Sequence, residues 1–285
     1  MSLAIVYTRA KYGVDAPLVR VETHLSNGLP SLSIVGLPET AVKESKDRVR
    51  SAIINSHFEF PSRRITINLA PADLPKEGGR FNLPIAIGIL AASGQIPVSE
   101  LEHLEFLGEL GLTGKLHPVQ GSLPAAIKTT AAKRALIVPP ANVNEATLCN
   151  QATVYSCKNL LQLSAHLHDR ERLIPQQGKP KTDTSLYYPD LSDVKGQTLA
   201  RRALEIAAAG KHNLLFCGPP GTGKTMLASR LPGILPPLSQ QEMLEVAAVY
   251  SISHQKRRQD YYQRPFRSPH HTASSVALVG GAFDG

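Results

Sequence analysis

One eight-residue segment constrains the fold of this chain more than any other. It reads Gly218-Pro219-Pro220-Gly221-Thr222-Gly223-Lys224-Thr225 and matches G-x-x-x-x-G-K-[ST], the pattern of a phosphate-binding loop (P-loop), at every constrained position. A short apolar run at 213–217 precedes the segment, and the helix-like sequence MLASRL follows it. The sequence therefore predicts a buried parallel strand, the loop and a helix, in that order.

Each constrained position of the loop has a chemical reason. Gly218, Gly221 and Gly223 allow the backbone conformations and the close approach that let amides surround a phosphate. Lys224 supplies a point charge for the β- and γ-phosphates. Thr225 offers a hydroxyl to Mg²⁺ and opens a helix whose positive end faces the anion. We therefore expect this segment to bind ATP together with Mg²⁺.

Hydrolysis requires an acid at the end of a second strand and a group that orients water. Only four acids follow Thr225, namely Glu242, Glu245, Asp260 and Asp284. The first two lie in QEMLEVAAVY, which predicts a helix, the third lies in a polar basic segment, and the fourth follows Gly-Gly-Ala-Phe. We expect none of them to act as the Walker B acid, so we identify no catalytic residue.

The clearest division of the chain lies at 170–187, a polar stretch with two prolines and a glycine. We predict a first domain at 1–169, a linker at 170–187 and a second domain at 188–285. Short strands alternate with amphipathic helices in the first domain, which predicts a mixed α/β or α+β fold. The expected strands are 32–35, 65–69 and 135–138, and the expected helices are 39–56, a segment starting near Pro84, 123–134 and, after the linker, 196–209.

Charge, apolar runs and cysteine content indicate the partners and the compartment to expect for this chain. The chain has 31 basic and 23 acidic residues, a net charge of +8, which permits nucleic-acid binding but does not require it. No apolar run approaches the roughly 18 residues of a membrane-spanning helix, and the first residues lack the pattern of a secretory signal. Cys149, Cys157 and Cys217 are odd in number and have neither CxxC nor zinc spacing, which favours reduced thiols in the cytoplasm.

Beyond the P-loop, several longer segments carry a specific resemblance that covers nearly the whole chain. They are GLPETAVKESKDRVRSAI at 36–53, ITINLAPADLPKEGGRFNLPIAIGILAAS at 65–93, LSDVKGQ at 191–197, AAAGKHNLLFCGPPGTGKTMLASRLPGILPPL at 207–238 and RPFRSPHHTASSVALVGG at 264–281. On these segments the chain resembles the ComM/YifB family, the magnesium-chelatase-like AAA+ ATPases associated with competence and recombination.

The resemblance implies a hexameric ATPase that drives branch migration on branched or single-stranded DNA, without a membrane partner. It also implies that Val194 and Gly196 flank the adenine, while 218–225 hold the phosphates and Mg²⁺. The family continues after the VGG stretch into the Walker B strand, sensors and an arginine finger, whereas this sequence ends Gly281-Ala-Phe-Asp-Gly285. We therefore expect this chain to be C-terminally truncated relative to the family and to bind nucleotide without autonomous turnover.

The first domain also resembles the proteolytic domain of Lon, a ribosomal-S5-domain-2-like fold. Arg80 occupies the place of the Lon serine, and Pro124 and Ala126 occupy the places expected for its lysine. A Ser–Lys dyad needs both a hydroxyl and an amine, so we expect no peptidase activity. Arg80 has two readings, a structural salt bridge or a contact to phosphates or DNA.

A second candidate region interleaves cations with aromatic residues at 254–271. This pattern suits single-stranded DNA, although it also fits a solvated insertion. The candidate DNA contacts are Lys256, Arg257, Arg258, Arg264 and Arg267, among the aromatic residues Tyr261, Tyr262 and Phe266.

Two further features favour structural roles. Adjacent residues on a strand point to opposite faces, so His270 and His271 do not form a metal pair. Cys217 lies in the predicted buried strand, which favours an inert packing thiol.

Two other functional classes remain open from the sequence. One is a magnesium-chelatase-type ATPase subunit that drives metal insertion into a tetrapyrrole. The other is a non-enzymatic module for docking or oligomerisation.

Overall fold

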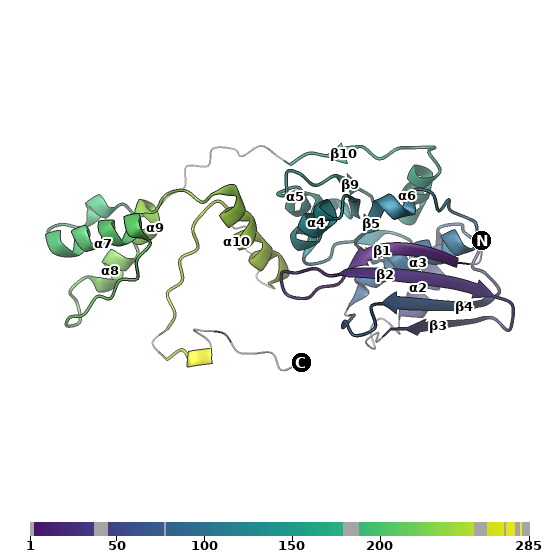
Figure 1. The fold of residues 1–285 in the computed structure, drawn as a ribbon, viewed down its shortest axis with the longest axis horizontal. Coiled ribbons are helices and arrows are strands. Elements are labelled where there is room, and N and C mark those ends of the chain that lie inside the picture. The colour runs from purple at the N-terminus through teal and green to yellow at the C-terminus, as the bar shows by residue number, and fades with distance from the viewer. Residues whose placement is uncertain are drawn as a thin grey trace. The chain divides into compact units, whose positions relative to one another are not determined.

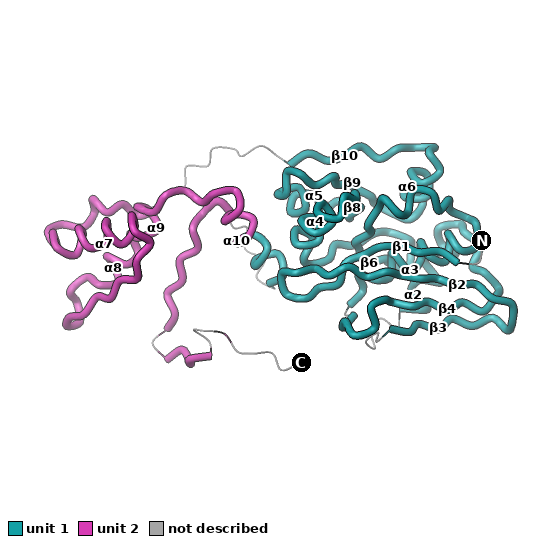
Figure 2. The backbone as a smooth tube through the Cα atoms, in the orientation of Figure 1, with its two compact units in different colours: residues 1–182, 247–257 teal, residues 183–246, 258–285 magenta. Residues whose placement is uncertain are grey.

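The computed structural model describes residues 3–36, 45–76, 78–178, 188–253, 261–270, 272–276 and 280. The chain separates into two compact units (Figure 2). Unit 1 contains residues 1–182 and 247–257, and unit 2 contains residues 183–246 and 258–285. The first boundary therefore falls within the stretch 170–187, where the sequence predicts a linker.

Unit 1 is built on a mixed eight-stranded sheet (Figure 1). Its strands are β1 (Leu3–Arg9), β2 (Leu18–Ser26), β3 (Ser31–Val35), β4 (Arg64–Ala70), β5 (Leu104–Phe106), β8 (Ala135–Val138), β9 (Val154–Ser156) and β10 (Pro175–Gln176). The spatial order is β10-β9-β8-β5-β1-β2-β4-β3. Antiparallel pairing joins β1 to β2, β2 to β4 and β9 to β10, while the other neighbours pair in parallel. A separate antiparallel pair consists of β6 (Glu109–Leu110) and β7 (Leu116–His117).

The core of unit 1 lies on one face of the sheet along β2 and β4, whereas β5 and most of β8 are buried on both faces. Burial alternates along β2 and β4, so every second side chain packs inward. Helix α3 (Asn82–Ala92) packs against β1 and β2, and α2 (Ser45–Asn55) packs against α3. All eleven residues of α3 are buried, as expected for a helix that is apolar all round. Its Gly88 permits this packing, because an added Cβ would lie 2.3 Å from Thr23 Oγ1 on β2.

Three further helices complete unit 1: α4 (Ser122–Ala131), α5 (Val143–Ala146) and α6 (Leu160–Leu167). The predicted strands at 32–35, 65–69 and 135–138 and the predicted helices near Pro84 and at 123–134 are confirmed by β3, β4, β8, α3 and α4. Helix α2 covers the described part of the predicted helix 39–56, and residues 39–44 lie outside the described residues.

Two details of unit 1 differ from the sequence analysis. Pro175 and Gln176, which belong to the predicted linker, pair with β9 as the edge strand β10; proline is tolerated there because an edge strand needs fewer amide donors. On the predicted helix 39–56, i,i+4 spacing would place Arg48 beside Glu44; in the structure Arg48 pairs with Glu109 on β6, and Glu44 lies outside the described residues.

Unit 2 is helical in its described part. Its helices are α7 (Thr198–Gly210), α8 (Lys224–Ala228), α9 (Leu231–Ile234) and the first half of α10 (Gln240–Ile252). A small core of Leu191, Val194, Leu204 and Leu227 joins the segment before α7 to α7 and α8. The predicted helices 196–209 and QEMLEVAAVY are confirmed by α7 and α10. The second half of α10 is counted with unit 1.

Candidate nucleotide-binding site

The P-loop forms a tight turn directly before α8. Gly221 and Gly223 have φ values of +81° and +83°, in the left-handed region. A Cβ at either residue would meet no atom within 4 Å. The requirement for glycine at these two positions is therefore conformational rather than steric, because other L-residues pay about 1–2 kcal/mol for this φ.

The loop amides are available to a ligand. The backbone N–H groups of Gly221, Thr222, Gly223 and Lys224 donate no hydrogen bond within the described part of the chain. Consecutive unpaired N–H groups of this kind form a concave site for anions. The loop therefore fits the phosphate group that its sequence pattern predicts.

Lys224 lies across this turn. Its Nζ donates to the carbonyl oxygens of Pro219 (2.7 Å) and Gly218 (2.8 Å) and lies 3.4 Å from Thr222 Oγ1. Thr222 Oγ1 in turn donates to Pro219 O at 3.0 Å. The hydroxyl-bearing Thr225 is exposed beside the lysine. The ammonium is thus held by neutral oxygens that charged phosphate oxygens can replace.

The segment before α7 reaches the loop. Val194 is buried in the small core of unit 2, and Gly196 has a φ of +67°. Gln197 follows, and its Nε2 donates to Thr222 O at 3.3 Å. The structure thus brings the predicted adenine-flanking segment to the loop through Gln197. Gln197 ends the motif LSDVKGQ, which is the one signal in the sequence that could have indicated its role.

The predicted buried strand at 213–217 is wrong. These residues form no strand, and Leu214 and Leu215 are 40% and 84% exposed. Cys217 is also exposed, so the prediction of a packing thiol fails with the strand. The physical reason is that strand pairing needs a neighbouring strand, and the described part of unit 2 contains none.

The acids after the loop that the structure describes lie on a helix. Glu242 and Glu245 are on α10, as predicted. Glu242 caps its own helix: its carboxylate accepts from Ser239 N at 2.9 Å, while its backbone N–H donates to Ser239 Oγ at 3.2 Å. The backbone hydrogen bond from Ser239 lowers the pKa of Glu242. Asp260 and Asp284 lie outside the described residues.

The structure describes two of the five predicted DNA contacts, Arg264 and Arg267. Lys256, Arg257 and Arg258 lie outside the described residues. Arg264 has structural partners: its backbone N–H donates to Tyr188 Oη (2.7 Å), its Nε donates to Pro236 O (2.8 Å), and its Nη2 lies 3.7 Å from Glu242 Oε2. Arg267 is exposed and remains a candidate.

The neighbouring histidines offer no metal site in the part that the structure describes. His270 Nδ1 lies 2.8 Å from Thr272 Oγ1, and His271 falls outside the described residues. Among the described residues, no three His, Cys, Asp or Glu side chains could hold one metal ion. In the same residues, no helix is both long enough and apolar enough to cross a membrane.

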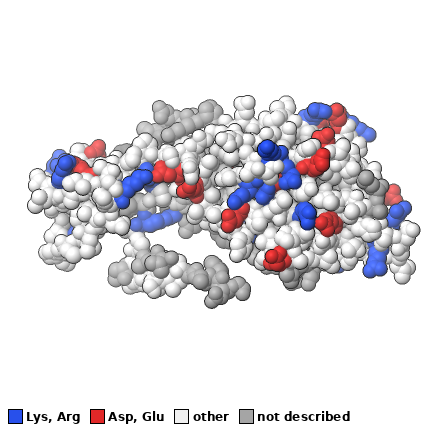
Figure 3. Space-filling view, viewed as in Figure 1, with Lys and Arg blue, Asp and Glu red and all other residues white. Residues whose placement is uncertain are grey.

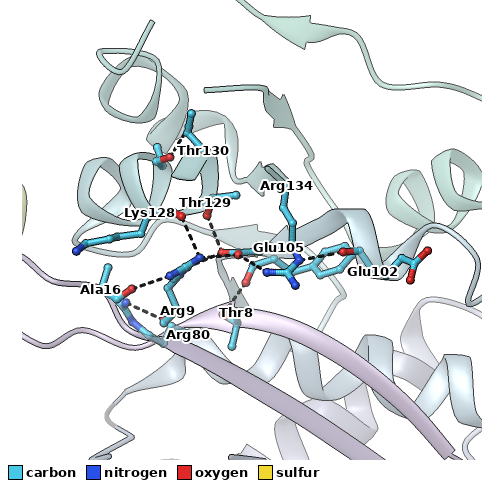
Figure 4. Close-up of polar contacts among 12 residues, drawn as sticks. Thr8, Arg9, Ala16, Arg80, Glu102, Glu105, Lys128, Thr129, Thr130 and Arg134 are labelled. Atoms are coloured by element: carbon cyan, nitrogen blue, oxygen red, sulfur yellow. Dashed lines mark hydrogen bonds and ion pairs between the residues drawn. The ribbon is translucent and has the colours of Figure 1, made fainter. Parts of the chain in front are cut away.

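A second polar cluster lies in the centre of unit 1 (Figure 4). Arg9 binds Glu105 through two hydrogen bonds, at 2.6 and 2.7 Å. Thr129 Oγ1 donates to the same carboxylate at 2.6 Å, and Arg134 Nη1 lies 3.4 Å from it. The carboxylate is fully buried, and these four contacts compensate its burial.

Arg80 belongs to the framework of this cluster. It is buried and donates to the backbone carbonyls of Arg9 (3.2 Å) and Gln120. This geometry favours the structural reading of Arg80, and the partners seen here are backbone carbonyls, whereas the sequence suggested a salt bridge. Pro124 and Ala126 are buried on α4, and the absence of peptidase activity stays a prediction.

These observations define a protein with two units, one that carries a P-loop and one built on a mixed sheet. Two family models match the chain: "Subunit ChlI of Mg-chelatase" at residues 21–142, and "Magnesium chelatase, subunit ChlI" at residues 190–284. The chain is 54% identical to competence protein ComM of Haemophilus influenzae. It is 56% and 52% identical to the uncharacterized proteins YifB of Salmonella typhimurium and Escherichia coli.

Each of these alignments covers 99% of the chain and 56% of the relative. The chain belongs to the magnesium-chelatase-like family that includes ComM and YifB. It spans about half the length of the curated relatives that it matches.

Proposed function

We propose that residues 218–225 bind ATP with Mg²⁺. The observation that carries this proposal is the set of unpaired loop amides beside the ammonium of Lys224, whose partners are neutral loop oxygens. On binding, Lys224 would exchange Gly218 O and Pro219 O for phosphate oxygens, and Thr225 would supply a hydroxyl ligand to the metal. The metal would supply positive charge that offsets the charge of the phosphates.

We further propose that proteins of this family use the site to act on DNA, in a motor of the branch-migration type. The family resemblance supports this, as do the name of the Haemophilus relative and the net charge of +8. For this chain by itself we propose binding without turnover. In the described residues, the acids that follow the loop cap or extend α10 and are not presented by a strand.

The test is binding of a fluorescent ATP analogue to the full chain in the presence of Mg²⁺. Lys224→Ala should weaken binding by roughly 10- to 100-fold, because charge-assisted hydrogen bonds are each worth about 1.5–3 kcal/mol. Arg202→Ala is the matched control, since this exposed cation of unit 2 pairs with Glu205 on α7. Equal affinity for the wild type and Lys224→Ala would contradict the proposal.

The family models favour a second candidate, a magnesium-chelatase-type subunit that drives metal insertion. Both candidates use the same ATP site and differ in their partner. ATP turnover by the full-length protein, measured with and without branched DNA, separates them. Stimulation by DNA supports the motor, whereas stimulation by partner subunits that carry a tetrapyrrole supports the chelatase-type role.

A further inference from the structure

A small pocket on unit 1 gathers three cationic side chains. It has a volume of about 230 Å³ and lies between the start of β3, helix α2 and the segment that leads into β4. Lys46 and Arg50 come from α2, and Arg63 comes from the connection to β4. Asp47 is the single acid in the lining, so the formal charge of the pocket is three minus one, or +2.

The fold holds these side chains on a packed floor. Phe60 and Leu32 line the pocket and pack against the core of unit 1. The guanidinium of Arg50 lies over the ring of Phe60, 5.1 Å from its centroid. Lys46 and Arg50 are four residues apart on one helix and therefore share a face.

None of the three cations forms an ion pair within the described residues, whereas Arg48 on the same helix pairs with Glu109. Over the face drawn in Figure 3, basic and acidic side chains of the described residues are interspersed. Converging like charges are unfavourable unless an anion binds between them.

The size and surroundings of the pocket indicate that its ligand is a polymer. Enclosed small-molecule sites usually measure about 300–1,000 Å³, which is larger than this pocket. Pro61, Ser62 and Arg63 also line a neighbouring pocket of about 400 Å³. A chain can thus pass from one pocket to the next across residues 61–63.

We propose that this pocket binds single-stranded nucleic acid. Lys46, Arg50 and Arg63 contact its phosphates, and the Arg50–Phe60 pair offers a face on which a base stacks. This inference rests on the DNA action proposed above and places a nucleic-acid contact on unit 1, apart from the candidates at 254–271.

The experiment measures binding of fluorescein-labelled oligothymidylate to the full chain as a function of salt. The triple variant Lys46→Gln/Arg50→Gln/Arg63→Gln should lower the slope of log K against log salt by about 2, since each phosphate contact on a single strand contributes about 0.7. This corresponds to roughly 100-fold weaker binding at 0.1 M salt. The control Lys133→Gln/Arg170→Gln/Arg172→Gln removes three exposed cations elsewhere on unit 1 and should leave the slope unchanged.

The experiment distinguishes a failure of the pocket proposal from a failure of the proposed DNA function. If the wild type binds the oligonucleotide and both triple variants behave alike, the pocket is not the site and the proposed function stands. If the wild type binds none, the DNA part of the proposed function fails and this inference fails with it. Competition by thymidine monophosphate as strong as by the oligonucleotide would indicate a small-anion site and overturn the polymer assignment.

Protein integrity is checked separately. The circular-dichroism spectrum and the thermal unfolding transition should be the same for both triple variants and the wild type. Arg63→Gln alone, in the connection outside α2, repeats the test if the triple variant unfolds; a slope reduced by about 0.7 is then expected, and an unchanged slope overturns the proposal.

Discussion

At the residue scale, the three thiols should differ sharply in reactivity. Cys217 is exposed, whereas Cys149 and Cys157 are buried, and burial raises the pKa of Cys157 to about 11. Because the thiolate is the reactive form, one thiol per chain should react quickly with a thiol reagent. Cys217→Ser should remove this fast phase. Three slow thiols would show that 213–217 is buried after all.

Glu105 is the residue on which the cluster in Figure 4 depends. Glu105→Gln should destabilise the protein by about 3–5 kcal/mol, because Arg9 and Arg134 would lose the buried carboxylate that compensates their charge. Glu102→Gln is the control, since Glu102 is 72% exposed and its ion pair with His103 lies at the surface. Its effect should stay within about 1 kcal/mol. Thermal unfolding followed by circular dichroism measures both, and equal shifts would contradict the assignment.

At the element scale, the start of α10 depends on a reciprocal cap. The backbone N–H of Ser239 holds the pKa of Glu242 below its ordinary value. The carboxylate therefore stabilises the folded protein at pH values above its unfolded pKa. This stabilisation is lost as the pH falls through the folded pKa. Ser239→Ala should raise the pKa of Glu242, because the hydroxyl no longer fixes the turn. NMR titration of the Glu242 carboxyl carbon measures this. A pKa that stays low in the variant would show that the backbone N–H at position 239 holds it without the hydroxyl.

Local pattern predicted some elements well. Helices α3 and α4 and strand β8 follow from short-range features, namely an apolar run after Pro84, a helical period and a β-branched run. The Ser-x-x-Glu cap of α10 at 239–242 is likewise contained in four consecutive residues. The sequence could predict the P-loop because its function is encoded in eight consecutive residues.

Other features depend on residues far apart and could not be predicted from pattern. Arg9 and Glu105 are 96 positions apart, and nothing in either neighbourhood indicates the other. The cations of the unit 1 pocket come from α2 and from the approach to β4, which become neighbours only when the sheet forms. The apolar run at 213–217 resembles a buried strand, yet burial depends on a partner that its own residues do not specify.

At the scale of the whole molecule, the chain passes between the two units three times, after residues 182, 246 and 257. The last segment of unit 1, residues 247–257, begins with the second half of α10. There, Ser251 O accepts from Gly121 N at 3.1 Å, and Ser251 Oγ donates to Glu145. Glu145 also accepts from Leu123 N at 3.1 Å, near the start of α4. Unit 1 is therefore completed by residues that follow most of unit 2 in the sequence.

The residues before the predicted linker therefore do not contain all of unit 1, because unit 1 also includes residues 247–257. A fragment that stops near residue 182 would leave Gly121 and Glu145 without the partners that Ser251 supplies. Conversely, a protease nick within 183–187 would yield two polypeptides that remain joined, because the later one still carries the end of α10. Each unit is thus made of two segments that alternate along the sequence.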